Sequence, residues 1–247
     1  MSPAPLYLLH MQPDPQRLAA WAARHHLLDQ SGDLGYVLHG LFRAAFGEHA
    51  PRSFRYLDAE QGLLAYTGLN AVDMQQLVAV APSDAAAALG LGATSSGPGL
   101  NARPFPTQWP VGHVLGFDVR VRPVIREGQT GKERDAFLAA VEKSSGAAMD
   151  RSEVYGQWLR EHLSRQGGAE LIDVTLDRFR LLDVMRQTQK GDADDARRRR
   201  PVSGPDAVLT GHLRVTDPVA FSELIGRGIG RHRAFGFGLL LLRPARH

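Results

Sequence analysis

Three polar side chains with complementary chemistry share one predicted helix near the N-terminus. Tyr36, His39 and Arg43 are three and four residues apart, so a helix places them on one face, roughly opposite Leu38 and Leu41. A histidine titrates near neutral pH, a tyrosine hydroxyl can orient a reacting group, and an arginine can neutralise phosphate charge. The set suits phosphoryl transfer without a metal. The alternative is that His39 is an ordinary solvated or capping residue.

A second candidate lies near the C-terminus, in the stretch Gly226-Arg-Gly-Ile-Gly-Arg-His-Arg-Ala-Phe-Gly-Phe-Gly238, hereafter the glycine loop. Glycines allow positive φ and close approach of another molecule, and exposed N–H groups in such a loop bind anions. Arg231, His232 and Arg233 add groups that suit phosphate. The alternative is a glycine-rich turn before the run 239–242, which is predicted to be a buried strand.

The first half of the chain contains the elements that would position Tyr36 and His39. Residues 83–112, rich in Ala, Gly, Ser and Pro, have the least regular pattern. The order of elements indicates a β-α-β-β-α-β, ferredoxin-like unit with one additional helix over residues 1–126. The predicted elements are a strand at 6–11, helices at 16–28 and 33–46, a hairpin at 53–69, a helix at 72–80 and a strand at 113–126.

The second half, residues 127–247, has a similar pattern and is predicted to be a second β/α unit. Residues 190–205 are charged and of low complexity, so we expect them to be mobile or ordered only by a partner. The predicted elements are helices at 133–143 and 151–165, a β-rich region at 169–188, a strand at 206–216, a helix at 218–226 and a strand at 235–243.

The composition points to a polyanionic partner through the distribution of arginine. The net charge is only +3, but lysine occurs three times, so 26 of the 29 cationic residues are arginine. They cluster at 120–126, 197–200 and 227–233, which favours a nucleic acid; a GC-rich genome is the alternative explanation for the bias. No apolar run is long enough for a membrane span and no leader pattern is present, which predicts a cytoplasmic protein without a membrane partner.

Several common enzyme classes lack their motifs. The chain has no cysteine and no histidine pair with metal-ligand spacing, so neither a metal site nor a cofactor is expected. Gly131-Lys132 lacks the other residues of a P-loop, and no G-x-S-x-G sequence is present.

Four segments resemble the RAMP superfamily of CRISPR proteins, and the register is closest to its CasE branch of precursor-RNA endonucleases. The segment 228–240 resembles the glycine-rich motif near the C-terminus of these proteins. The segment 208–218 resembles the strand, and the start of the helix, that precede this motif. Tyr36-Val-Leu-His39 matches the family's Tyr-x-x-His, and 117–123 resembles its Phe-x-x-Arg-x-x-Pro strand.

The resemblance implies an α+β fold of two tandem ferredoxin-like (RRM-like) domains and a metal-independent endoribonuclease. In such enzymes the ribose 2′-hydroxyl attacks the adjacent phosphate, giving a 2′,3′-cyclic phosphate. His39 would be the general acid or base, and Tyr36 would assist by positioning or proton donation. A non-catalytic guide-RNA-binding RAMP subunit and an unrelated RRM-like protein are the alternatives. The Tyr36/His39 pair favours the enzyme, since a subunit that only binds RNA needs no general acid.

The expected partners are a CRISPR repeat stem-loop and, if the product stays bound, subunits of an effector complex. Arg233 stands where the family usually has a lysine. Arginines on both domains suit recognition of a stem by shape and phosphates. The residues predicted to contact RNA are Arg43, Arg120, Arg122, Arg197, Arg198, Arg199, Arg200, Gly228, Gly230, Arg231, His232, Arg233, Gly236 and Gly238.

Overall fold

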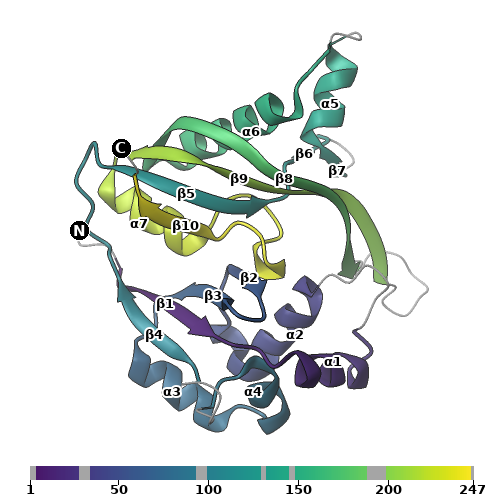
Figure 1. The fold of residues 1–247 in the computed structure, drawn as a ribbon, viewed down its shortest axis with the longest axis vertical. Coiled ribbons are helices and arrows are strands. Elements are labelled where there is room, and N and C mark those ends of the chain that lie inside the picture. The colour runs from purple at the N-terminus through teal and green to yellow at the C-terminus, as the bar shows by residue number, and fades with distance from the viewer. Residues whose placement is uncertain are drawn as a thin grey trace.

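The structure is a computed structural model that describes residues 4–27, 34–92, 99–128, 132–144, 148–187 and 199–245, with the backbone alone at 184–187 and 199–202. Two antiparallel four-stranded sheets lie one above the other, each with its own helices (Figure 1). None of the described helices is both long and apolar enough to cross a membrane.

The first unit has the sheet order β2-β3-β1-β4, all antiparallel. Leu9 and Met11 of the central strand β1 are fully buried and pack against Trp21 and Leu41 from the helices that cover this face. Its elements are β1 (Leu6–Met11), α1 (Pro15–Arg24), α2 (Gly35–Phe46), η1 (Gly47–His49), β2 (Phe54–Asp58), β3 (Gly62–Thr67), α3 (Ala71–Val80), α4 (Ser83–Leu89) and β4 (Asn101–Phe105).

The prediction for residues 83–112 was wrong, because this segment contains a helix and the strand that closes the first sheet. The alanine-rich sequence of α4 favours a helix that is too short to show a clear period. Strand β4 lies at the sheet edge beside β1, and an edge strand is where a proline such as Pro104 is tolerated. Neither feature gives the alternating pattern by which a strand is recognised.

The second unit repeats the same order, β10-β5-β9-β8, in which the fourth strand of the unit lies beside the first. A small sheet of β6 and β7 adjoins it. Its elements are β5 (Val114–Val121), β6 (Val124–Arg126), β7 (Glu133–Asp135), α5 (Ala136–Lys143), α6 (Arg151–Gln166), β8 (Ala169–Gln187), β9 (Arg199–Val215), α7 (Pro218–Arg227), η2 (Arg233–Phe235) and β10 (Leu240–Pro244).

Strand β5 therefore opens the second sheet and does not close the first, which corrects the expectation for residues 113–126. It pairs with β9 and β10 along its length. Phe117 and Val119 are buried in the second core, together with Phe221 of α7 and Leu159 of α6. The alternation on β5 identified a strand correctly, but it contains no information on which partner strand lies beside it.

The two units are joined by contacts between their sheets. The Tyr66 hydroxyl on β3 donates to the Leu240 carbonyl on β10 at 3.1 Å. Arg55 on β2, only 5% exposed, forms an ion pair with Asp118 on β5 at 3.1 Å. Leu6 of β1 also belongs to the second core. Buried contacts of this kind fix the relative position of the units, so a site between them has defined geometry.

Candidate active site between the two units

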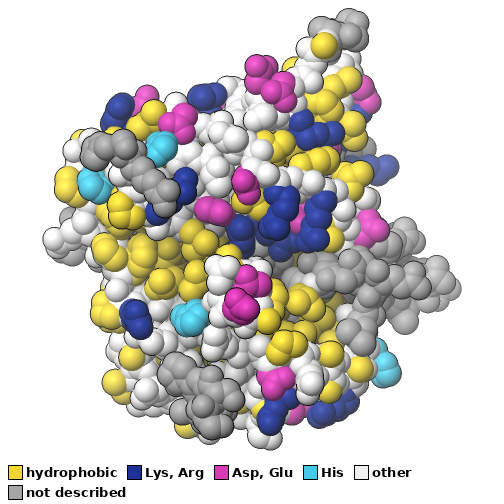
Figure 2. Space-filling model, viewed as in Figure 1, with side chains coloured by type: hydrophobic (Ala, Val, Ile, Leu, Met, Phe, Trp, Pro, Cys, Tyr) yellow, Lys and Arg dark blue, Asp and Glu magenta, His cyan; other side chains and the backbone are white. Residues whose placement is uncertain are grey.

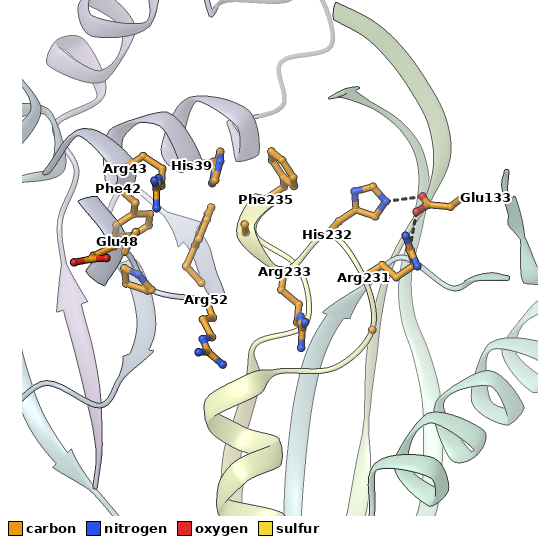
Figure 3. A pocket seen from close by; sticks show the side chains of 15 residues that line it. His39, Phe42, Arg43, Glu48, Arg52, Glu133, Arg231, His232, Arg233 and Phe235 are labelled. Atoms are coloured by element: carbon orange, nitrogen blue, oxygen red, sulfur yellow. Dashed lines mark hydrogen bonds and ion pairs between the residues drawn. The ribbon is translucent and has the colours of Figure 1, made fainter. Parts of the chain in front are cut away.

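A pocket of about 800 Å³ lies between α2, the segment that follows it, and the glycine loop (Figure 3). It brings together residues more than 190 positions apart in the chain, with His39 on one wall and the loop on the other. Its lining residues are His39, Phe42, Arg43, Glu48, Ala50, Pro51, Arg52, Phe54, Glu133, Gly230, Arg231, His232, Arg233, Ala234 and Phe235.

Helix α2 presents the predicted polar face. Val37 and Leu38 are buried in the first core, whereas Tyr36 and His39 are half-buried and Arg43 is exposed. Burial, and secondarily the positive charge of Arg43, lowers the pKa of His39 below its ordinary 6.5. The neutral imidazole therefore predominates at neutral pH, which suits a group that accepts a proton.

The phenyl ring of Phe235 connects the glycine loop to α2. It stacks on Tyr36 with ring centres 6.1 Å apart and planes 4° apart, and its centre lies 4.9 Å from that of the His39 ring. Phe235 is part of η2, so the conformation of the loop determines how the His39 side chain is covered. Tyr36 contacts this ring and is not itself among the pocket-lining residues.

The loop glycines shape the backbone. A Cβ on Gly238, where φ is +78°, would lie 2.2 Å from the Ile229 carbonyl oxygen, and one on Gly228 would lie 2.8 Å from the Gly238 oxygen. The N–H groups of Gly228, Gly236 and Gly238 donate to carbonyls of the protein. These three amides are thus engaged within the protein, and the predicted contact of the loop glycines with RNA stays a prediction.

Glu133 on β7 holds the loop from the second unit. Its carboxylate, 5% exposed, accepts from Arg231 Nε and from His232 Nε2, both at 2.6 Å. The hydrogen bond from His232 contributes most to lowering the pKa of Glu133, to about 2, so the group is ionised at neutral pH. Sequence analysis missed Glu133, since it lies 98 residues from Arg231 with no motif around it.

A cluster of arginines lies on the other side of the loop. Arg233 Nη1 donates to the Arg227 carbonyl at 3.0 Å, and burial, then the charges of Arg227 and Arg52, lower the pKa of Arg233. Over the described residues, no carboxylate forms an ion pair with Arg52, Arg227 or Arg233. The cluster therefore favours an anion in the pocket. Arg52, which no motif marked, was missed by the sequence analysis.

Two arginines predicted to contact RNA, Arg120 on β5 and Arg122 directly after it, have guanidiniums that are engaged within the second unit. Arg120 donates to both oxygens of Asp206 at 2.8 and 2.9 Å, and its guanidinium lies 4.3 Å from the centre of the Phe237 ring. Arg122 is 1% exposed and donates to the Leu182 carbonyl. Alternation along β5 suggested exposed side chains, but the sheet packs both guanidiniums into the second unit.

The arginine run after the low-complexity segment is described only in part. Arg197 and Arg198 lie outside the described residues. Arg199 and Arg200 belong to β9, paired with Gln187 and Arg186 of β8, but their side chains are not described. RNA contact by this run stays a prediction. Among the described residues, no three histidine, aspartate or glutamate side chains form a group that could hold a metal ion.

Fold and site together define a protein of two ferredoxin-like domains with a histidine in a cationic pocket between them. A sequence model of the family described as CRISPR associated protein matches residues 6–244, and the chain belongs to that family. A comparison with curated proteins finds no significant match.

Solved structures share the fold across nearly the whole chain. The CRISPR endoribonuclease Cse3 bound to a 19-nucleotide RNA matches with a TM-score of 0.62 and 20% identity, over 97% of this chain and 100% of that one. Thermus thermophilus Cse3, bound to an RNA representing a pre-cleavage complex, matches with a TM-score of 0.58 and 20% identity, over 97% of this chain and 100% of that one. A chain of a CRISPR RNA-guided surveillance complex matches with a TM-score of 0.54 and 19% identity, over 97% of this chain and 100% of that one.

Proposed function

We propose that this protein is a metal-independent endoribonuclease that cleaves CRISPR repeat hairpins in precursor RNA and leaves mature guide RNA with a 2′,3′-cyclic phosphate. The observation that carries the proposal is His39, half-buried in a pocket that also contains Arg52 and Arg233. A proton-transfer group beside cations without carboxylate partners suits cleavage of a phosphodiester. The described solved relatives bind RNA, and one holds it before cleavage.

The chemistry assigns one proton transfer to His39. The ribose 2′-oxygen attacks phosphorus as its proton leaves, the bond from phosphorus to the 5′-oxygen breaks, and that oxygen gains a proton. Because the pKa of His39 is lowered, its neutral form is available to accept the 2′-hydroxyl proton. Positioned proton transfer of this kind contributes about 10²–10⁴-fold to the rate.

The arginines supply charge and orientation. Arg52 and Arg233 would face the phosphate as negative charge develops on its oxygens, an electrostatic role that is strongest where water is excluded. Tyr36 would act as a positioning residue, since its ring stacks on Phe235 and Phe235 covers His39. Figure 2 shows cationic side chains gathered where the second sheet meets the first unit, beside this region. Such a surface suits the phosphates of a stem.

A further part of the proposal concerns partners and location. The match to a chain of an RNA-guided surveillance complex supports retention of the product as one subunit of an effector complex. Cleavage and retention would take place in the cytoplasm, where the precursor transcript is made.

The test is cleavage of a cognate repeat RNA in excess EDTA. We expect cleavage to persist without metal, to stop when a 2′-deoxynucleotide replaces the scissile ribose, and to yield 5′-hydroxyl and 2′,3′-cyclic phosphate ends. Loss of cleavage in EDTA that returns with magnesium would contradict the proposed mechanism. Tight binding of the repeat without any cleavage would instead indicate a guide-RNA-binding subunit.

A further inference from the structure

A buried carboxylate outside the family motifs holds two consecutive residues of the glycine loop. Glu133, on β7, accepts from Arg231 and His232 at 2.6 Å, and the His232 side chain is itself only 10% exposed (Figure 3). A buried charge requires such pairing, because an unpaired carboxylate loses its hydration without compensation. The two partners are adjacent in the chain, so one carboxylate fixes both the side chains and the backbone between them.

The backbone at His232 needs this support. Its φ is +57°, in the left-handed region that side-chain-bearing residues seldom adopt. His232 is also the N-cap residue of η2, and its carbonyl accepts from the N–H of Phe235 at 2.9 Å. A strained conformation persists only where its surroundings hold it. The ion pair with Glu133 supplies that restraint at the start of η2.

The restraint continues to His39 through one side chain. Phe235 lies between the two histidines in Figure 3, with its ring centre 6.2 Å from that of His232 and 4.9 Å from that of His39. It also stacks on Tyr36. Glu133, in the second unit, thus connects through His232 and Phe235 to the polar face of α2 in the first unit.

We infer that Glu133 is a positioning residue: by holding His232 in its left-handed conformation, it seats Phe235 against His39 and so fixes that imidazole for proton transfer. The inference rests on the proposed function. Misplacement of a reacting group by about 1 Å costs about 100-fold in rate, so release of the loop should lower kcat. Binding of RNA should change little, since Arg52 and Arg233, which have no carboxylate partner among the described residues, remain in the pocket.

The substitution Glu133→Gln tests this with little change in shape. Arg231 and His232 bond different oxygens of Glu133, so with glutamine one of the two donors would face an NH2 group instead of an acceptor. We expect kcat for single-turnover cleavage to fall about 10- to 100-fold with KM changed by less than about threefold. Glu142→Gln is the matched control: it removes an exposed carboxylate that pairs with Arg134, away from the pocket, and should leave both constants unchanged.

A double-mutant cycle separates positioning from general destabilisation. His232→Gly removes the contact with Glu133, and glycine adopts the positive φ without strain. Adding Glu133→Gln to that variant should then lower kcat by less than about threefold, because the two residues act through one another. An equal loss of kcat in both backgrounds, or an unchanged kcat in Glu133→Gln, would overturn the inference.

A measurement that does not depend on cleavage tests the role of Glu133 separately from the proposed function. In Glu133→Gln the withdrawn Phe235 ring should expose His39, so its pKa, followed by NMR titration of the imidazole, should rise toward the ordinary value. An unmoved pKa of His39 would count against the inference even in a protein that cleaves RNA. Failure of the wild-type protein to cleave would contradict the function alone. The charged and titratable groups around His39 in the pocket are Arg43, Glu48, Arg52, Glu133, Arg231, His232 and Arg233.

Discussion

Helix α2 of the first unit and helix α6 of the second unit follow the first strand of their sheets and carry similar polar side chains, but they use them differently. On α6, the Tyr155 hydroxyl donates to Asp135 at 2.9 Å and accepts from Arg151 at 2.6 Å. The Arg151 guanidinium lies 4.0 and 4.1 Å from the ring centres of Phe137 and Phe179. Every member of this group has its partner within the unit.

Tyr155 on α6 and Tyr36 on α2 also differ in how deeply they are buried. Tyr155 is 0% exposed, and burial, followed by the charge of Asp135, raises its pKa. Tyr36 and His39 on α2 are half-buried, and Arg52 and Arg233, which line the same pocket as His39, form no ion pair with a carboxylate of the described residues. The two helices therefore differ in their surroundings: the polar group of α6 is buried among partners of its own unit, whereas His39 of α2 lines a pocket that also contains Arg52 and Arg233.

The largest effect should come from His39→Ala. We expect single-turnover cleavage to slow by about 10²–10⁴-fold, because the proton-transfer group is lost while the fold is retained. Circular dichroism and Tm should match the wild type. His49→Ala, at an exposed histidine on η1 near the same helix, is the control and should cleave at the wild-type rate. An equal rate in the two variants would remove His39 from the mechanism.

Asp135→Ala tests the opposite side of the comparison. It leaves Arg151 and Tyr155 without their carboxylate and removes the side-chain cap of α5, where Asp135 accepts from the Phe137 N–H at 2.8 Å. Breaking a buried pair in this way costs about 3–5 kcal/mol. We expect that loss in the free energy of urea unfolding, with kcat of the folded protein unchanged at low temperature. A lowered kcat at full folding would show that the second network serves catalysis as well.

Phe235→Ala should change the pH dependence of cleavage. The ring contributes to the burial that keeps the pKa of His39 below 6.5, so its removal should raise that pKa. Protonation of His39 would then begin at higher pH, and the acid limb of kcat should move upward if His39 accepts the proton. The profile of kcat from pH 4.5 to 8.5 measures this. An acid limb that moves to lower pH would contradict the role of the Phe235 ring in burying His39.

The smallest effect is expected from Arg52→Gln. Removal of one phosphate-facing cation should weaken RNA binding a few-fold and lower the slope of log K against log salt by about 0.7–0.9. Arg24→Gln removes an exposed arginine of α1 that pairs with Asp84 at 3.1 Å, and the salt slope should remain that of the wild type. Fluorescence anisotropy at several salt concentrations gives both slopes. Equal slopes for the two variants would place Arg52 away from the RNA.

Local patterns predicted the parts of the molecule that local forces determine. The face of α2 follows from helical spacing, and β1 from a short apolar run, so the sequence predicted correctly that Tyr36 and His39 lie on the polar face of one helix. The partner of β5 depends on pairing with strands about 90 and 120 residues away, which alternation does not encode. Likewise, the contact of Glu133 with His232 joins residues 99 positions apart, which no local pattern encodes.

If His39 transfers the proton, its protonation state limits cleavage, and a comparison of two pKa values tests this most directly. NMR titration of the imidazole, assigned by its absence in His39→Ala, gives the first; the single-turnover rate of repeat-RNA cleavage against pH gives the second. We expect the pKa from NMR to lie below 6.5 and a limb of the rate profile to turn at that pKa. A profile without any inflection at the measured pKa of His39 would contradict it.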